Sequence, residues 1–149
     1  MGKTLKILVD TIDLSLINRH KWSINSRGYV QRKEENPRKH YLLHREILNV
    51  TESKCLVDHI NGNKLDNRRA NLRLATPSQN QANAKKSKNN TSGFKGVSWH
   101  ASSQKFQARL CFNRKLIALG LFKTAIEAAY AYNKAAVLYF GEFAKLNKL

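Results

Sequence analysis

Asp58 and Asn80 are the residues whose types and spacing most directly suggest chemistry. Asp58 follows the strand-like pair Leu56-Val57, and Asn80 comes shortly after Thr76, which can open a helix. A helix that packs on the strand would bring the two side chains opposite each other. Because a carboxylate and an amide oxygen can together ligate one hard cation, the pattern predicts a metal site beside His59.

Local signals predict the elements that such a site needs, over residues 55–84. The Asn61-Gly62 dipeptide favours a tight turn, and the chain returns over 71–75 with alternating apolar residues. Thr76 can then cap a helix in which Pro77 takes the first position and Gln79 completes a capping box. The segment is predicted to be a small ββα unit.

The sequence DHINGNKLDNRRANLR, followed by Asn80 in PSQN, resembles the motif of the HNH endonucleases. It is most similar to the subgroup found in homing endonucleases of phages and introns. Asn80 stands where the family name has a histidine, and it still offers an oxygen ligand. Each residue taken singly is compatible with a solvated pair or with ordinary turn chemistry, but several spaced elements agree at once. We therefore favour the nuclease interpretation.

The resemblance implies a role for each motif residue. His59 is expected to be the general base, since its ordinary pKa lies near neutrality, and Asn71 to hold the loop and so orient it. Asp58 and Asn80 are expected to bind one divalent ion, Mg²⁺ or Mn²⁺, because oxygen ligands favour these metals. No structural zinc is expected, since the chain has only two cysteines, Cys55 and Cys111.

A further histidine, His44, lies in Leu-His-Arg upstream of the motif. A histidine at this place recurs in the family that the chain resembles, so His44 is a candidate for a position near the metal site. The alternative, which we favour, is that it caps or packs the helix beneath the hairpin.

The charge of the chain indicates a polyanionic partner. Its 149 residues carry a formal net charge of +17, and no acidic residue lies between Asp66 and Glu127. Such a stretch is typical of a surface that neutralises phosphates. The candidate contacts from the motif and the following segment are Arg68, Arg69, Arg73, Lys85, Lys86 and Lys88.

The same composition argues against other partners and settings. The chain has no long apolar run, no amphipathic basic helix and no signal-peptide pattern. We therefore expect a cytoplasmic protein, of a bacterial or phage-infected cell, that binds double-stranded DNA rather than a membrane or a small-molecule substrate. It is expected to be a monomer or a dimer.

Residues 1–84 are predicted to form the nuclease domain, in which a small α+β lead-in precedes the ββα unit. The lead-in is expected to hold a strand, a short helix, a hairpin, a polar loop and a second helix, over 5–9, 13–20, 21–32, 33–39 and 41–48. A basic linker is expected over 85–92.

Residues 93–149 are predicted to form a three-stranded antiparallel sheet packed on one helix. The clearest strand is 105–112, where Phe106 and Ala108 alternate with Gln107 and Arg109. A capping box, Thr124 to Glu127, opens a helix that runs to about residue 140. The fold class is thus α+β throughout.

The segments FKGVSWH, KFQARL, LGLF and TAIEAAYAYNKAA resemble the Apetala-type (ethylene-response-factor) DNA-binding domain. The resemblance implies that the outer face of the sheet meets DNA. Its position-by-position counterparts here are Lys95, Ser98, His100, Arg109, Cys111, Leu116 and Ala118. Several of these are arginine or tryptophan in the plant domains, so the plant target sequence is not expected. Trp99 is equally suited to DNA contact and to the core.

Together these features predict a metal-dependent DNA endonuclease of the homing type, positioned by its C-terminal module. Two alternatives remain open from the sequence. One is a DNA-binding regulator with a vestigial nuclease fold, and the other is a basic RNA-binding protein.

Overall fold

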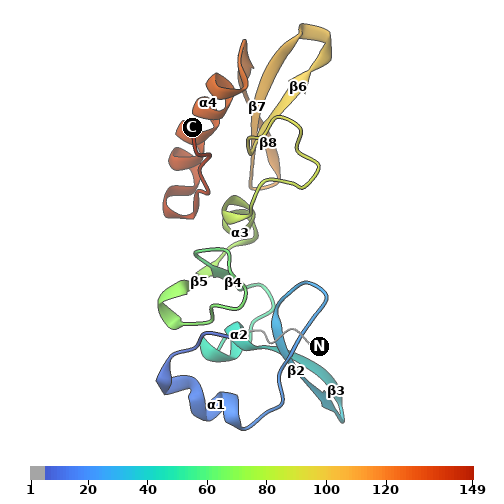
Figure 1. The fold of residues 1–149 in the computed structure, drawn as a ribbon, viewed down its shortest axis with the longest axis vertical. Helices are drawn as coiled ribbons and strands as arrows, with labels where there is room; N and C mark the ends of the chain where they lie inside the picture. The colour runs from blue at the N-terminus through green and yellow to red at the C-terminus, as the bar shows by residue number, and fades with distance from the viewer. Residues whose placement is uncertain (1–5) are drawn as a thin grey trace. The chain divides into compact units, whose positions relative to one another are not determined.

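The computed structural model describes residues 6–149, which form two compact units. Met1–Thr76 is the N-terminal unit and Pro77–Leu149 is the C-terminal unit (Figure 1). No helix among the residues that the structure describes is both long and apolar enough to cross a membrane.

The N-terminal unit contains two small antiparallel sheets, β1-β2-β3 and β4-β5, with short helices. Its elements are η1 (Thr11–Asp13), α1 (Leu14–Asn18), β1 (Ser23–Ile24), β2 (Val30–Glu35), β3 (Arg38–Leu42), α2 (Leu43–Ile47), β4 (Leu56–His59), η2 (Arg69–Asn71) and β5 (Leu72–Ala75). The strand predicted over 5–9 begins outside the described residues. Within them, Leu8 forms a single parallel bridge with Asp66.

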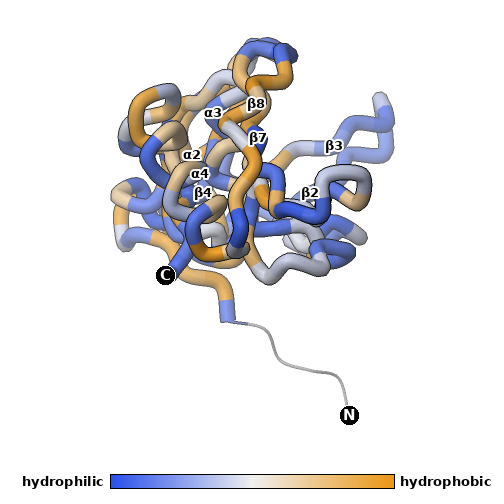
Figure 2. Tube along the Cα trace, turned by 90° about the horizontal axis from the view of Figure 1, so that it is seen from above, coloured by the Kyte–Doolittle hydropathy of each residue, from blue (hydrophilic) through white to orange (hydrophobic). Residues whose placement is uncertain are grey.

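The prediction of a loop over 33–39 is wrong, because β2 and β3 continue through it as a hairpin. Arg32 supplies the physical reason. Its guanidinium carbon lies 3.8 Å from the ring centroid of its cross-strand neighbour Tyr41, and the same group pairs with Glu34 and Glu46. These contacts hold together a hairpin that is almost entirely hydrophilic (Figure 2). The predicted helix over 41–48 is accordingly shorter, since Tyr41 still belongs to β3.

A compact apolar core fixes β4 and β5 in the N-terminal unit. Val30, Leu43, Ile47, Val57 and Leu72 are buried together. These side chains come from β2, α2, β4 and β5. The core therefore sets the position of the strand that ends in Asp58 and His59.

The C-terminal unit contains the predicted sheet and helix. Its elements are α3 (Pro77–Asn83), β6 (Val97–His100), η3 (Ala101–Ser103), β7 (Lys105–Phe112), β8 (Lys115–Phe122), α4 (Ala125–Phe140) and η4 (Gly141–Phe143). The sheet is antiparallel in the order β6-β7-β8, and α4 lies alongside it (Figure 1). The capping box of Thr124 and Glu127 is confirmed. The small side chains of Ala108, Ala128 and Ala129 are fully buried between helix and sheet.

The segment expected to be a linker, 85–92, lies within the C-terminal unit. Asn90 and Ser92 tie its end to β6, since both donate hydrogen bonds to the carbonyl oxygens of Phe94 and Val97. The Ser92 hydroxyl lies 2.8 Å from the Val97 oxygen. This end of the segment is therefore folded onto the sheet.

Gly96 offers a test of how closely α4 approaches the sheet. Its φ is +75°, and an added Cβ would lie 2.1 Å from Cδ2 of Tyr132 and 2.7 Å from the carbonyl oxygen of Arg109. We expect Gly96→Ala to lower the free energy of unfolding by more than about 2 kcal/mol, from backbone strain and overpacking. Gly93→Ala is the matched control, because Gly93 has a φ of +83° but no atom within 4 Å of its added Cβ. Gly93→Ala should lower the free energy of unfolding, measured by urea denaturation, by about 1 kcal/mol. Equal losses in the two variants would contradict the close packing at Gly96.

Candidate functional site

Asp58 and His59 are the last two residues of β4. Both are buried, with exposed fractions of 5% and 4%. Asp58 lies directly across from Arg73 on β5. The Arg73 guanidinium donates to Oδ2 of Asp58 from Nε at 3.0 Å, and its terminal nitrogen lies at 3.0 Å from the same oxygen. The buried Asp58 side chain thus has an arginine partner directly across the two strands.

The His59 ring is held in a pocket of polar and aromatic groups. Its Nε2 lies 3.3 Å from Oδ1 of Asn67, which can only accept, so Nε2 carries the hydrogen and Nδ1 is the basic nitrogen. Burial lowers the pKa of His59, while the hydrogen bond to Asn67 and the carboxylates of Asp58 and Asp66 act in the opposite direction. The histidine is therefore neutral at physiological pH, the form that can accept a proton.

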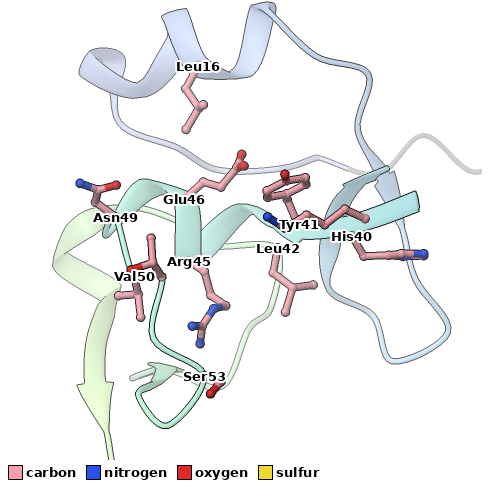
Figure 3. A pocket seen from close by; sticks show the side chains of 11 residues that line it. Leu16, His40, Tyr41, Leu42, Arg45, Glu46, Asn49, Val50 and Ser53 are labelled. Carbon is pink, nitrogen blue, oxygen red and sulfur yellow. The ribbon is translucent and has the colours of Figure 1, made fainter. Parts of the chain in front are cut away.

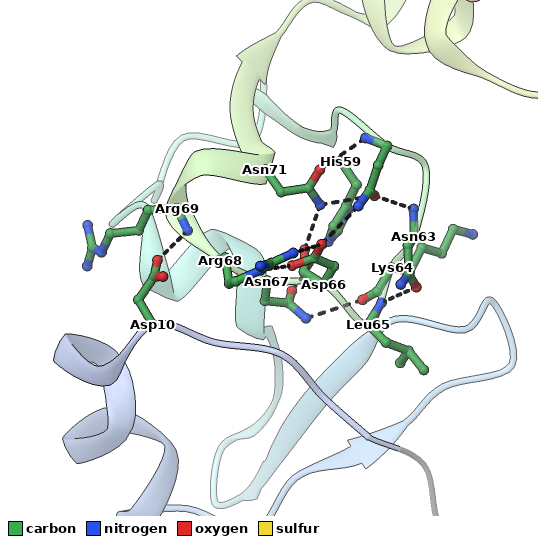
Figure 4. Close-up of polar contacts among 11 residues, drawn as sticks. Asp10, His59, Asn63, Lys64, Leu65, Asp66, Asn67, Arg68, Arg69 and Asn71 are labelled. Atoms are coloured by element: carbon green, nitrogen blue, oxygen red, sulfur yellow. Dashed lines mark hydrogen bonds and ion pairs between the residues drawn. The ribbon is translucent and has the colours of Figure 1, made fainter.

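Asn71 ties together the loop that joins β4 to β5 (Figure 4). Its Oδ1 accepts from the backbone N–H of Asn61 at 3.0 Å, and its Nδ2 donates to Oδ1 of Asn61 at 3.1 Å and to the carbonyl oxygen of Asp66 at 2.8 Å. Asn61 in turn donates to the Asp66 carboxylate at 2.9 Å. Because Asn67 belongs to this loop, the network also fixes the group that holds His59.

The three arginines predicted to contact DNA near the motif each have a carboxylate partner. Arg68 pairs with Asp66 at 2.8 Å, Arg69 with Asp13 at 2.7 Å, and Arg73 with Asp58. The Arg68 guanidinium is the main cause of a pKa of about 2 for Asp66. Asp13 lies far from Arg69 in the sequence, so the sequence gives no signal for this pair. Arg68 and Arg69 stay about half exposed, whereas the Arg73 side chain is only 12% exposed.

His44 lies against His59, with ring centroids 5.0 Å apart, and Tyr29 packs on both rings. It is 4% exposed, and its Nδ1 is buried with no hydrogen-bond partner among the described residues. Burial, with a smaller contribution from His59, lowers the pKa of His44 to about 3. The His44 ring therefore packs in the interior of the N-terminal unit and lies against His59.

The pKa of His44 predicts an acid-sensitive fold. In the unfolded chain its pKa returns to about 6.5, so between pH 6.5 and 3 the unfolded state binds more protons and stability falls as the pH drops. We expect His44 to account for about 2 kcal/mol of the stability lost between pH 7 and pH 5. Urea unfolding at both pH values should show a smaller loss in His44→Phe. An unchanged loss would mean that His44 titrates normally in the folded protein.

The helix that carries Asn80 belongs to the C-terminal unit. Asn80 is half-buried on α3, and Ala82 packs into the apolar cluster of that unit with Leu110, Tyr132 and Phe140. This membership was missed from the sequence. Ala82 stands among polar residues, and a single small apolar residue gives only a weak sign of burial.

Lys95, one of the predicted DNA contacts in the C-terminal unit, makes hydrogen bonds within that unit. The Lys95 ammonium group donates to carbonyl oxygens at and just after the end of α3, at 3.3 Å from Gln81 and 2.7 Å from Ala84, with Ala82 as a third acceptor. Burial lowers its pKa to about 8. The Lys95 ammonium group is thus bound within the C-terminal unit.

The remaining candidates lie at the sheet surface or in the preceding segment. Arg109 is exposed, and its guanidinium lies 3.5 Å from the Ser98 hydroxyl. His100 contacts the Ser103 hydroxyl at 3.1 Å. Lys85, Lys86 and Lys88 are exposed, and Lys86 donates to the carbonyl oxygen of Gly93 at 2.7 Å.

Trp99 shares a strand face with buried Val97, and its ring lies edge-on to Phe106 at 4.9 Å. Alternation along β6 puts Trp99 on the side of Val97 and Ser98 on the opposite side, but Trp99 is 47% exposed.

A cavity of about 650 Å³ in the N-terminal unit lies apart from the motif (Figure 3). Its lining includes Leu16, Tyr41, Leu42 and Arg45, but neither Asp58 nor His59. Arg45 also donates to the carbonyl oxygens of Cys55 and Glu52, each at 2.6 Å. This side chain therefore fixes the loop that leads into β4.

Carboxylate and amide oxygens, the groups that Asp58 and Asn80 carry, are ligands that Mg²⁺ and Mn²⁺ prefer. Among residues 6–149, no group of three or more His, Cys, Asp and Glu side chains is placed to hold a metal ion.

Comparison with known proteins identifies the family. Residues 50–82 match the family model described as HNH endonuclease. A protein of Acanthamoeba polyphaga mimivirus named "Uncharacterized HNH endonuclease L560" is 33% identical over 153 residues, covering 99% of this chain and 78% of that protein. "Protein 3.8" of Escherichia phage T7 is 43% identical over 63 residues, covering 42% of this chain and 52% of that protein. No solved structure matches.

The chain therefore belongs to the HNH endonuclease family. It is a nuclease, a hydrolase whose family implies DNA as the substrate. HNH nucleases generally use a divalent metal ion. The class predicted from the motif is thereby confirmed.

Proposed function

We propose that this nuclease is a metal-dependent endonuclease of the homing type that hydrolyses phosphodiester bonds in duplex DNA, with His59 as its general base. The observation that carries the proposal is the state of His59. Its ring is buried, its pKa is lowered, and Asn67 holds Nε2 so that Nδ1 is the basic nitrogen. A neutral imidazole fixed in one tautomer can take a proton from water at physiological pH.

The other motif residues support this reaction. His59 accepts the proton of the attacking water through Nδ1, and Asn71 keeps the loop that carries Asn67 in place. Asp58 and Asn80 would hold one Mg²⁺ or Mn²⁺ ion, which when bound supplies Lewis-acid stabilisation of the phosphate. The oxygen of the attacking water bonds to phosphorus as the P–O3′ bond breaks, and the departing O3′ takes a proton from solvent, which leaves a 3′-hydroxyl and a 5′-phosphate.

The C-terminal unit is proposed to bind the duplex through the outer face of its sheet. Arg109, Ser98 and His100 are the polar candidates on this face, and Lys85 and Lys88 offer further positive charge. Leu116 on β8 is 64% exposed beside Cys111, so the face combines charge with apolar groups. Such a surface suits the major groove, where phosphates and thymine methyl groups lie together.

Cleavage of matched substrates tests the choice of duplex DNA. Radiolabelled duplex DNA and structured RNA of equal length are incubated with the protein and magnesium, each with a chelator control. We expect metal-dependent cuts in the DNA only. Cleavage or tighter binding of the RNA would favour the RNA-binding alternative, and DNA binding without cleavage would favour a regulator.

A further inference from the structure

The helix that carries Asn80 is built into the C-terminal unit by contacts along its length. Near its start, the Ser78 hydroxyl accepts from the backbone N–H of Asn113 at 3.2 Å. Towards its end, the carbonyl oxygen of Ala82 accepts from the backbone N–H of Lys145 at 3.2 Å, and the Ala82 side chain is 4% exposed. The orientation of α3 is therefore set by the fold of the C-terminal unit.

Lys95 contacts the end of α3 through three hydrogen bonds from one side chain. The carbonyl oxygens of Gln81, Ala82 and Ala84 all accept from its ammonium group. Carbonyls in the last turn of a helix lack partners within the helix and carry the negative end of its dipole. A lysine that binds three of them at once fixes the end of the helix in both position and direction.

The backbone of Lys95 is itself anchored. Its N–H donates to Oδ1 of Asn147 at 2.7 Å, and its carbonyl oxygen accepts from Nδ2 of Asn147 at 3.1 Å. Asn147 is in turn linked to Asn133 on α4 by two hydrogen bonds, at 2.8 and 2.9 Å. The contacts thus run from α4, through Asn147 and Lys95, to the end of α3.

We propose that Lys95 is a positioning residue of the nuclease, which holds the end of α3 on the C-terminal unit and thereby fixes Asn80. Ala84, whose carbonyl it binds, follows Asn80 by one helical turn. The inference rests on the proposed function, in which Asn80 is a metal ligand. It gives Lys95 a role within the C-terminal unit that is separate from contact with DNA.

Metal binding by the full-length chain tests this role. Mn²⁺ affinity is measured by electron paramagnetic resonance, and DNA affinity by fluorescence anisotropy without metal. We expect Lys95→Met to weaken Mn²⁺ binding by roughly 10- to 100-fold, as for residues that orient ligands, and to leave DNA affinity within about twofold. Lys95→Arg, which keeps the charge and the donors, should recover most of the Mn²⁺ affinity. Lys134→Met, at an exposed lysine on α4, should change neither quantity.

Hydrogen–deuterium exchange separates failure of this inference from failure of the proposed function. Lys95→Met should speed exchange in residues 81–84, and if it does not, Lys95 does not hold the helix. Loss of DNA affinity with unchanged Mn²⁺ binding would make Lys95 a DNA contact and overturn the proposal. If Asn80→Ala leaves Mn²⁺ binding intact, Asn80 is not a ligand and the proposed site itself fails. Should Lys95→Met not fold, Lys95→Arg and Lys95→Gln give the same comparison.

Discussion

Replacing His59 with alanine is expected to slow metal-dependent DNA cleavage by about 10²- to 10⁴-fold, the contribution typical of a general base. The loss should appear in the single-turnover rate at saturating DNA, because the ring is only 4% exposed and no predicted DNA contact depends on it. The measurement is the conversion of supercoiled plasmid to the open circle. Added imidazole should restore part of the rate by entering the space that the ring leaves.

Two further variants serve as controls for the His59→Ala result. His59→Gln keeps most of the volume without a base of suitable pKa, so it should cleave as slowly as the alanine variant if folding is intact. His20→Ala, at an exposed histidine of the same unit, should cleave normally. A His59→Ala variant that cleaves at the wild-type rate would remove His59 from the reaction.

Asp58→Asn should raise the metal concentration needed for half-maximal cleavage by roughly tenfold or more, because an amide replaces the charged ligand. It should also destabilise the N-terminal unit, since the Arg73 side chain is 12% exposed and would lose its buried partner. Breaking such a pair costs about 3–5 kcal/mol. Cleavage is therefore measured over a magnesium titration, well below the melting temperature of the variant.

Arg73→Met is the matched control for this loss of stability. It breaks the same ion pair and keeps the carboxylate, so it should lower the melting temperature by a similar amount with a much smaller change in the metal requirement. Equal shifts of the metal requirement in both variants would indicate that Asp58 acts through the fold rather than as a ligand.

Elements with strong local signals were predictable from the sequence. The capping box at Thr124 and the alternation along β7 gave the C-terminal sheet and helix. The apolar residues that flank the loop from Asn61 to Asn71 gave β4 and β5. In each of these cases, neighbours in the sequence decide the structure.

Features that depend on distant partners were not predictable. The β2-β3 hairpin is polar, and it is held by Arg32 through Glu46 on a following helix. Arg69 finds its carboxylate at Asp13, across most of the N-terminal unit in sequence. Lys95 binds backbone carbonyl oxygens, which every residue has, so no residue type in the sequence marks its partners. The motif was therefore predictable from the sequence, whereas the side chains that support it were not.

Removing and restoring the metal tests whether this protein is a metal-dependent nuclease that uses His59 as its general base. The purified full-length protein and His59→Ala are treated with chelator, dialysed, and incubated with supercoiled plasmid before and after magnesium is added. Neither protein should nick the plasmid without metal, and magnesium should restore nicking to the wild type alone. Nicking by the wild type in chelator, or equal nicking by both proteins with magnesium, would contradict this use of metal and His59.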